Sequence, residues 1–224
     1  MRRLFHWTFD PQGRFVQLVL AEKGLEATHL PSPPWQPHPD VAKLAPGASG
    51  VALVHRANEA QYIAIGAQAI CEYLEEAGEG ARMLPRLTED RAEARRVWRL
   101  IDDGLKDACT YLLSERIAIA RDRSHTPDST RLRTGAHALR SKLTLFNHLA
   151  ETRNYLAGRT LTLADFSLAA HLSCFDYFSD VPWSLAPDLK SWYGRIKSRP
   201  SFRAILSETL EGTRPAAHYA DLDF

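Results

Sequence analysis

The sequence predicts a small α/β domain followed by an all-helical domain. Short apolar runs alternate with helix-like segments as far as residue 76. The stretch GEGARMLPRLTED then has the glycine, proline and charge content of a linker. After it, apolar residues recur with helical spacing almost to the end of the chain. We therefore expect an α/β domain at 1–79, a linker at 80–89 and a helical domain at 90–224.

Turn-forming residues separate the elements of the first domain. Gly24 and Gly78 follow helix-like stripes in the position of C-caps, and Asn58-Glu59 separates two strand candidates. The proline-rich stretch SPPWQPHPDV excludes regular structure before a short helical turn. The expected elements, in the order βαβαββα, lie at 3–7, 15–23, 27–30, 40–44, 51–55, 61–65 and 68–76. This order predicts a small mixed sheet with helices on its faces.

The second domain is expected to contain long helices at 91–119 and 132–152, joined by the polar loop RDRSHTPDSTR. Thr162 and Asp165 have the S/T-x-x-D spacing of a capping box at the start of the next apolar run. We interpret this pair as a structural cap that stabilises the fold. The last stretch, 213–224, has no helical capping pattern and is expected to form a tail.

Composition argues against several classes of protein. A formal net charge of +1 gives no overall field for binding nucleic acid, and no window approaches eighteen apolar residues, so direct membrane insertion is not expected. Three widely spaced cysteines, Cys71, Cys109 and Cys174, suit reduced thiols in the cytoplasm. The histidines never form HExxH and the cysteines never form CxxC, so we expect no metal site.

Four blocks of sequence, in family order, resemble those of glutathione transferase-like proteins. They are LFHWTFDPQGRFVQLVLAEKGLE, AICEYLEE, YLAGRTLTLADFSLAAHL and LKSWYGRIKSRPSF, and together they extend over nearly the whole chain. The resemblance implies a thioredoxin-like N-terminal domain, a helical C-terminal domain of the glutathione transferase type and a homodimer. It also implies three devices for glutathione: a Ser, Cys or Tyr after the first strand, a Val followed by a cis-proline, and a Glu-Ser pair before x-Ala-Ile.

This chain departs from the family pattern at each device. The first loop offers only a threonine hydroxyl and an aspartate, and an anion there disfavours a thiolate. Alanine replaces the proline, and a trans bond is expected because a cis bond without proline costs about 2.5–4 kcal/mol. Gly-Ala replaces Glu-Ser, although backbone amides at that helix start could still bind a carboxylate. The expected remnant glutathione groove consists of Thr8, Asp10, Arg14, Val51, Ala52, Gly66, Ala67 and Gln68.

Two exposed-looking segments are candidates for binding a partner. Trp35, flanked by prolines, is interpreted either as a lid packed on the sheet or as a displayed anchor. The tail mixes apolar and acidic residues, which is typical of a docking segment: Tyr219, Asp221, Leu222, Asp223 and Phe224. This ending, together with DYFSDVPW, resembles a glutathione transferase-like family of alphaproteobacterial cell-division proteins. The resemblance implies a dimer that binds the tubulin-like filament protein FtsZ and reaches a septal division protein through its C-terminal end.

Three functions remain open at the level of sequence. In the first, which the resemblance implies, the chain is a non-enzymatic protein that binds FtsZ filaments at the division site and needs no cofactor. Alternatively, it is a diverged transferase or reductase that uses glutathione, or a binding module of the same fold with another partner. Co-sedimentation with FtsZ and retention on glutathione distinguish these hypotheses.

Overall fold

The structure is a computed structural model, and it describes residues 1–48, 50–57 and 60–222. The chain divides into two compact units, Met1–Leu84 and Pro85–Phe224. Each unit builds its own core, and each is described separately below.

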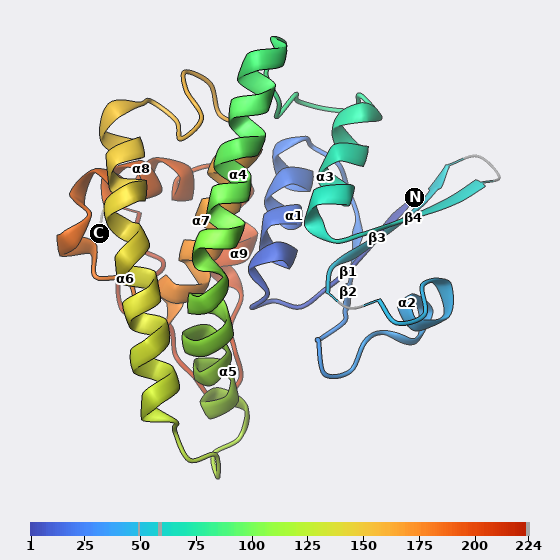
Figure 1. Cartoon of the computed structure of the whole chain (residues 1–224). Coiled ribbons are helices and arrows are strands. Elements are labelled where there is room, and N and C mark those ends of the chain that lie inside the picture. Colours follow the sequence, from blue (N-terminus) through green and yellow to red (C-terminus); the bar gives the residue numbers. More distant parts are fainter. Residues whose placement is uncertain (49, 58–59, 223–224) are drawn as a thin grey trace. The chain divides into compact units, whose positions relative to one another are not determined.

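A four-stranded mixed sheet forms the centre of the first unit (Figure 1). The strand order is β2-β1-β3-β4, with β1 parallel to β2 and antiparallel to β3, and with β3 antiparallel to β4. The strands are β1 (Arg2–His6), β2 (Thr28–Pro31), β3 (Ala52–Ala57) and β4 (Ala60–Ile65). With the intervening helices, the observed order is the predicted βαβαββα.

Helices α1 (Pro11–Glu22) and α3 (Ala67–Glu76) pack against each other, whereas α2 (Pro39–Leu44) contributes to a separate core. In that core Val41 of α2 packs on Phe5, Ala52 and Val54 of the sheet. Helix α1 begins four residues before the predicted 15, because Asp10 caps its free amides and Pro11 suits its first turn.

The second unit is helical (Figure 1). Its helices are α4 (Thr88–Ala108), α5 (Ser114–Arg121), α6 (Ser129–Thr152), α7 (Leu163–Tyr177), α8 (Pro187–Lys197) and α9 (Arg203–Ser207). Single 3-10 turns lie at Trp183–Leu185 and Pro200–Phe202. Within the described residues, none of the helices has both the length and the apolar character that crossing a bilayer would require.

A π-helical turn interrupts the single long helix that was predicted over 91–119. The turn, Cys109–Leu113, separates α4 from α5. Here α6 approaches so closely that a Cβ atom at Gly135 would lie 2.3 Å from the backbone nitrogen of Leu112. The periodicity of the sequence could not reveal this close approach, because it depends on a glycine in another helix.

Helix α7 is the central helix of the second unit, and every one of its residues is buried. Thr162 and Asp165 form the capping box at its start. The Asp165 carboxylate also accepts hydrogen bonds from Leu156 N at 2.8 Å and from Trp192 Nε1 at 3.2 Å. The cap therefore joins the start of α7 to the preceding loop and to α8.

Candidate functional site

In the loop after β1, the Asp10 carboxylate is bonded to backbone N–H groups of the chain itself. Asp10 accepts hydrogen bonds from Gln12 N and Gly13 N, each at 3.2 Å, as the N-cap of α1. Burial raises the pKa of Asp10 to about 6, although the two backbone N–H groups favour the charged form. At the first of the three glutathione-binding positions, Asp10 therefore caps helix α1.

Arg14 is fully buried, which corrects its assignment to the groove as a source of charge for a ligand. Its Nε donates to Thr8 O at 2.7 Å, and its guanidinium carbon lies 4.4 Å from the centre of the Phe9 ring. A guanidinium packed on an aromatic ring and bonded to a carbonyl is held as part of the core. It ties helix α1 to the loop that precedes it.

The second device lies at the start of β3, where Val51 and Ala52 are both buried. No described peptide bond is cis, so the Val51–Ala52 bond is trans. The Val51 carbonyl accepts a hydrogen bond from Gly66 N at 2.9 Å. This backbone is therefore tied to the residue that follows β4, and the two side chains belong to the core.

At the third device, the start of α3, Gly66 has a φ of +82°, a conformation that glycine adopts far more readily than other residues. A Cβ atom there would meet nothing within 4 Å, so backbone conformation rather than crowding favours glycine. The Ala67 methyl is buried, whereas Gln68 is exposed. The region offers a ligand the Gln68 amide, but neither Gly66 nor Ala67 carries a charge or a hydroxyl.

A histidine pair at the end of β1 was missed by the sequence analysis. His6 Nε2 lies 3.1 Å from His29 Nδ1, and His6 Nδ1 lies 2.9 Å from Gln17 Nε2. Burial, reinforced by His29, lowers the pKa of His6 to about 4, so the ring is neutral at physiological pH. The two histidines are distant in sequence, and only the parallel pairing of β1 with β2 brings them together.

Trp35 is partly packed and partly exposed. Its ring meets the Trp7 ring edge to face, with centroids 4.8 Å apart, yet 44% of the residue is exposed. The structure therefore leaves part of this large aromatic side chain accessible on the first unit.

Tyr219 is completely buried, which corrects its assignment to a docking segment. Its ring packs edge to face on Tyr177 of α7, with centroids 5.2 Å apart, and its hydroxyl donates to Ile205 O at 3.3 Å. Tyr177 also donates its hydroxyl hydrogen to Thr213 O at 3.0 Å. This part of the tail is a strap on the helical unit.

Beyond the strap, the tail returns to the surface. Asp221 and Leu222 are exposed, with 45% of Leu222 open to solvent. The buried Lys197 of α8 holds this end, because its Nζ donates to Asp221 O at 2.7 Å and to His218 O at 3.1 Å. Asp223 and Phe224, the other expected docking residues, lie outside the described residues.

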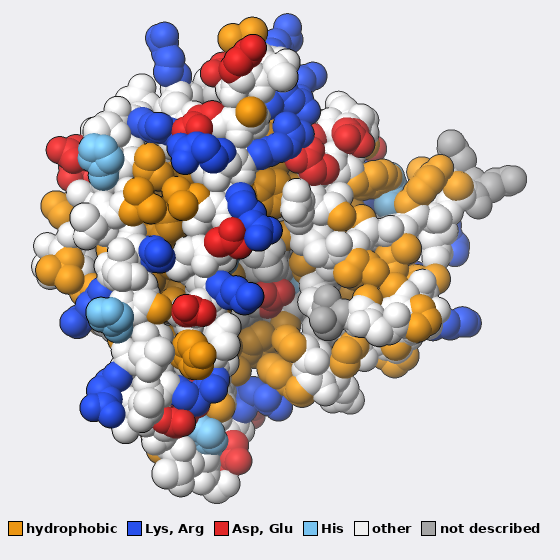
Figure 2. Space-filling view, viewed as in Figure 1, with side chains coloured by type: hydrophobic (Ala, Val, Ile, Leu, Met, Phe, Trp, Pro, Cys, Tyr) orange, Lys and Arg blue, Asp and Glu red, His pale blue; other side chains and the backbone are white. Residues whose placement is uncertain are grey.

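A shallow hollow of about 350 Å³ lies on α4 and α6 of the second unit. It is lined by Arg96, Arg99, Leu100, Asp103, Gly104 and Lys142. Figure 2 shows Lys and Arg side chains gathered along α4, with acidic side chains between them. Arg99 pairs with Asp103 at 2.7 Å, so charges of both signs alternate on this face.

The chain matches known proteins in both sequence and structure. Residues 129–208 match the family model described as Glutathione S-transferase, C-terminal domain. FtsZ-localized protein A of Caulobacter vibrioides (strain NA1000 / CB15N) is 40% identical over 224 residues, covering 100% of this chain and 98% of that protein.

Solved structures agree with the sequence match. The structure of FzlA from C. crescentus has a TM-score of 0.93 at 40% identity and covers 100% of this chain and 99% of that one. A glutathione S-transferase from Sinorhizobium meliloti 1021 has a TM-score of 0.91 at 34% identity, with 100% of both chains covered. One from Rhodospirillum rubrum F11 has a TM-score of 0.89 at 36% identity, again with 100% of both chains covered.

These matches confirm the expected fold, a thioredoxin-like domain followed by a helical domain of the glutathione transferase type. Identity of 40% maintained along the whole length exceeds what a shared fold alone requires. The chain therefore belongs to the glutathione transferase-like family that includes FtsZ-localized protein A.

Proposed function

We propose that this chain is a cytoplasmic, non-enzymatic protein of bacterial cell division that binds FtsZ filaments at the division site. The observation that carries the proposal is the full-length identity of 40% to a protein named for its localisation with FtsZ. The fold alone would not suggest this function, because one fold serves many unrelated activities.

The chemistry of the remnant groove supports a function without glutathione. Asp10 caps a helix, Arg14 is buried in the core, and Gly66-Ala67 carries neither a carboxylate nor a hydroxyl. Polar contacts contribute about 1–3 kcal/mol each when their partner would otherwise be left unsatisfied. Losing contacts at three places should weaken glutathione binding by several kcal/mol.

Two exposed features are assigned to partners. We assign Trp35 to the filament, because it is an aromatic anchor braced by Trp7. We assign the end of the tail, Asp221 to Phe224, to a septal division protein, with Leu222 as its exposed apolar residue. Buried Tyr219 holds the tail in place and is left out of the contact.

We further propose that the chain is a homodimer that uses the hollow on α4 and α6. In a twofold interface the same patch meets itself, so a face with charges of both signs can pair Arg96 or Lys142 of one copy with Asp103 of the other. A dimer would present each partner-binding feature twice, which favours the linking of filaments through avidity.

Co-sedimentation with FtsZ polymerised by GTP tests the central proposal. The wild-type chain should pellet with filaments and stay in the supernatant when GDP replaces GTP. Trp35→Ala should reduce the pelleted fraction, whereas Leu44→Ala, which truncates another exposed apolar residue of the same unit, should not. Equal pelleting with and without filaments would overturn the proposal.

The alternative of a glutathione-dependent enzyme is favoured by one observation. Two of the similar solved structures, at 34% and 36% identity over the full chain, are named glutathione S-transferases. Retention on immobilised glutathione with elution by free glutathione, together with conjugation of a chlorinated aromatic above the uncatalysed rate, would support this alternative. We expect neither result.

A further inference from the structure

Strand β4 is an open edge of the sheet that lacks the usual protection. It lies at the end of the strand order, and its sequence AQYIAI contains no charged residue and no proline. Tyr62 and Ile63 are exposed apolar residues on it, and Figure 2 shows hydrophobic side chains gathered over this part of the first unit. Natural edge strands are usually shielded by lysine, proline or a bulge, so an uncharged exposed edge is suited to pairing with another strand.

The register of the sheet fixes which backbone groups of β4 face outward. Arg56 N donates to Met1 O at 2.9 Å, so the backbone of Arg56 is turned toward β1. Gly66 N donates to Val51 O at 2.9 Å, so the backbone of Val51 is turned toward β4 and that of Gly66 toward β3. Hydrogen-bonded and non-bonded pairs alternate in an antiparallel ladder. With Arg56 opposite Gln61 and Val54 opposite Ile63, the N–H and C=O groups of Gln61, Ile63 and Ile65 point to the open edge.

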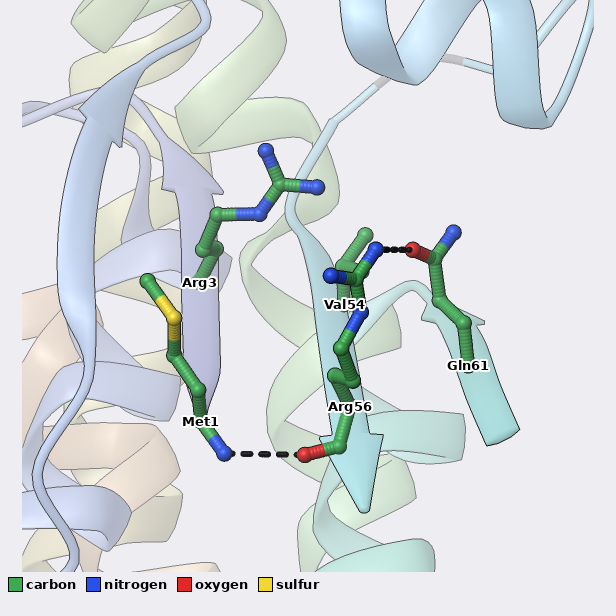
Figure 3. A pocket seen from close by; sticks show the side chains of 5 residues that line it. All are labelled: Met1, Arg3, Val54, Arg56 and Gln61. Atoms are coloured by element: carbon green, nitrogen blue, oxygen red, sulfur yellow. Dashed lines mark hydrogen bonds between the residues drawn. The ribbon is translucent and has the colours of Figure 1, made fainter. Parts of the chain in front are cut away.

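A basic hollow of about 210 Å³ lies beside this edge, on the sheet face that α2 only partly covers. Figure 3 shows its lining residues, which come from β1, β3 and β4 and from the residue before β1: Met1, Arg3, Val54, Arg56 and Gln61. Arg3 pairs with Asp40 of α2 at 2.8 Å, whereas the guanidinium of Arg56 points to the neutral carboxamide of Gln61, 3.4 Å away. The hollow therefore carries more positive than negative charge along the edge strand.

We propose that β4 is a docking edge for an extended segment of a partner protein that carries acidic side chains at alternate positions. The added strand would bond to the outward backbone groups of β4. Because side chains alternate between the faces of a strand, every second side chain of that segment lies on the face of Arg56 and Arg3, where carboxylates are favoured. The intervening side chains lie on the face of Tyr62, where apolar groups are favoured.

A labelled peptide of alternating glutamate and valine is the probe, and its lysine-valine counterpart is the control. The acidic peptide should bind the full-length chain saturably in fluorescence polarisation, and the basic peptide should not. Arg56→Glu should weaken binding about tenfold or more, and Arg140→Glu, on an exposed residue of α6, should leave it unchanged. Thermal melting of both variants checks that they are folded.

Amide exchange followed by NMR tests the register directly. Peptide binding should slow the exchange of the outward amides of Ile63 and Ile65 and leave those of Tyr62 and Ala64 unchanged. Ile63→Pro removes an outward donor without removing a bond to β3, so it should abolish peptide binding and preserve the melting temperature.

Several results would overturn the proposal: equal binding of the basic peptide, no effect of Arg56→Glu, or slowed exchange elsewhere in the chain. If the Ile63 amide were protected from exchange in the absence of peptide, and this protection were lost on dilution, the edge would instead bind a second copy of the chain. The experiment contains no FtsZ, so its outcome is independent of the function proposed above.

Discussion

Replacing Lys197 with methionine should loosen the strap that holds the C-terminal tail. The lysine side chain is fully buried, and its Nζ donates to the carbonyls of His218 and Asp221. The carboxylate of Asp176 lies 4.0 Å away, at the limit of an ion pair, and is itself bonded to His218 Nε2 at 2.8 Å. Methionine keeps the volume of the side chain, so the change removes the hydrogen bonds and the charge beside Asp176 without opening a cavity.

The magnitude follows from two opposing effects. Each hydrogen bond from a charged donor contributes about 1.5–3 kcal/mol, so losing two costs about 3–6 kcal/mol. Burial lowers the pKa of Lys197, because removing the ammonium from water is unfavourable, and relief of this desolvation offsets part of the loss. A net cost of about 3 kcal/mol would lower the melting temperature of a chain of this size by about 6–12 °C.

Thermal unfolding by circular dichroism measures this change, and hydrogen exchange locates it. The amides of Ala216, Tyr219 and Asp221, which donate to backbone carbonyls, should exchange faster in the variant. Lys106→Met, which replaces an exposed lysine of α4, is the matched control and should melt like the wild type. If Lys197→Met melted within about 2 °C of the wild type with unchanged exchange, the strap would not depend on this lysine.

Three further changes test the packing and electrostatics. In denaturant unfolding, Gly135→Ala should destabilise the chain by about 1–3 kcal/mol, because the added methyl would clash with Leu112. Gly104→Ala is the control and should be neutral or stabilising, because the nearest atoms lie 3.7 Å from its added methyl. Equal effects of the two changes would contradict the close approach of α6. The pKa of His6 is about 4 in the folded chain and 6.5 in the unfolded one, so the free energy of unfolding should decrease as the pH falls between these values, by up to about 1.4 kcal/mol per pH unit. His6→Gln should reduce this dependence of stability on pH, and an unchanged dependence would show that His6 is not its source. Gly66→Glu should cost about 1–2 kcal/mol in the same assay, because a side chain is strained at positive φ, and a stable variant would argue that the turn readily adapts.

The order of elements could be predicted from the sequence because it depends on local patterns. Alternating apolar runs, glycine C-caps and the proline-rich stretch place β1 to α3 close to their observed bounds. The predicted 91–119 helix is interrupted at Cys109–Leu113, where Leu112 lies against Gly135, a residue of another helix. Local propensity contains no information about such a contact.

The candidate site could be predicted only in part, for the same reason. The absence of the family's polar groups at positions 66 and 67 is visible in the sequence. The burial of Arg14 is not visible in the sequence, because an arginine on an apolar helix face can also point to solvent. Its packing on Phe9, which buries it, is a tertiary contact. Tyr219 was misassigned likewise, since its burial depends on Tyr177, which lies far from it in the chain.

The positions of the remnant groove have become part of the chain's own architecture. Asp10 satisfies amides of α1, Ala52 fills the core under α2, and Gly66 permits a positive φ before α3. Each of these residues therefore stabilises local structure within the first unit. Trp35 and Leu222, by contrast, are exposed, so their replacement costs the core little. A substitution at such an exposed residue can therefore test the proposed binding without unfolding the scaffold.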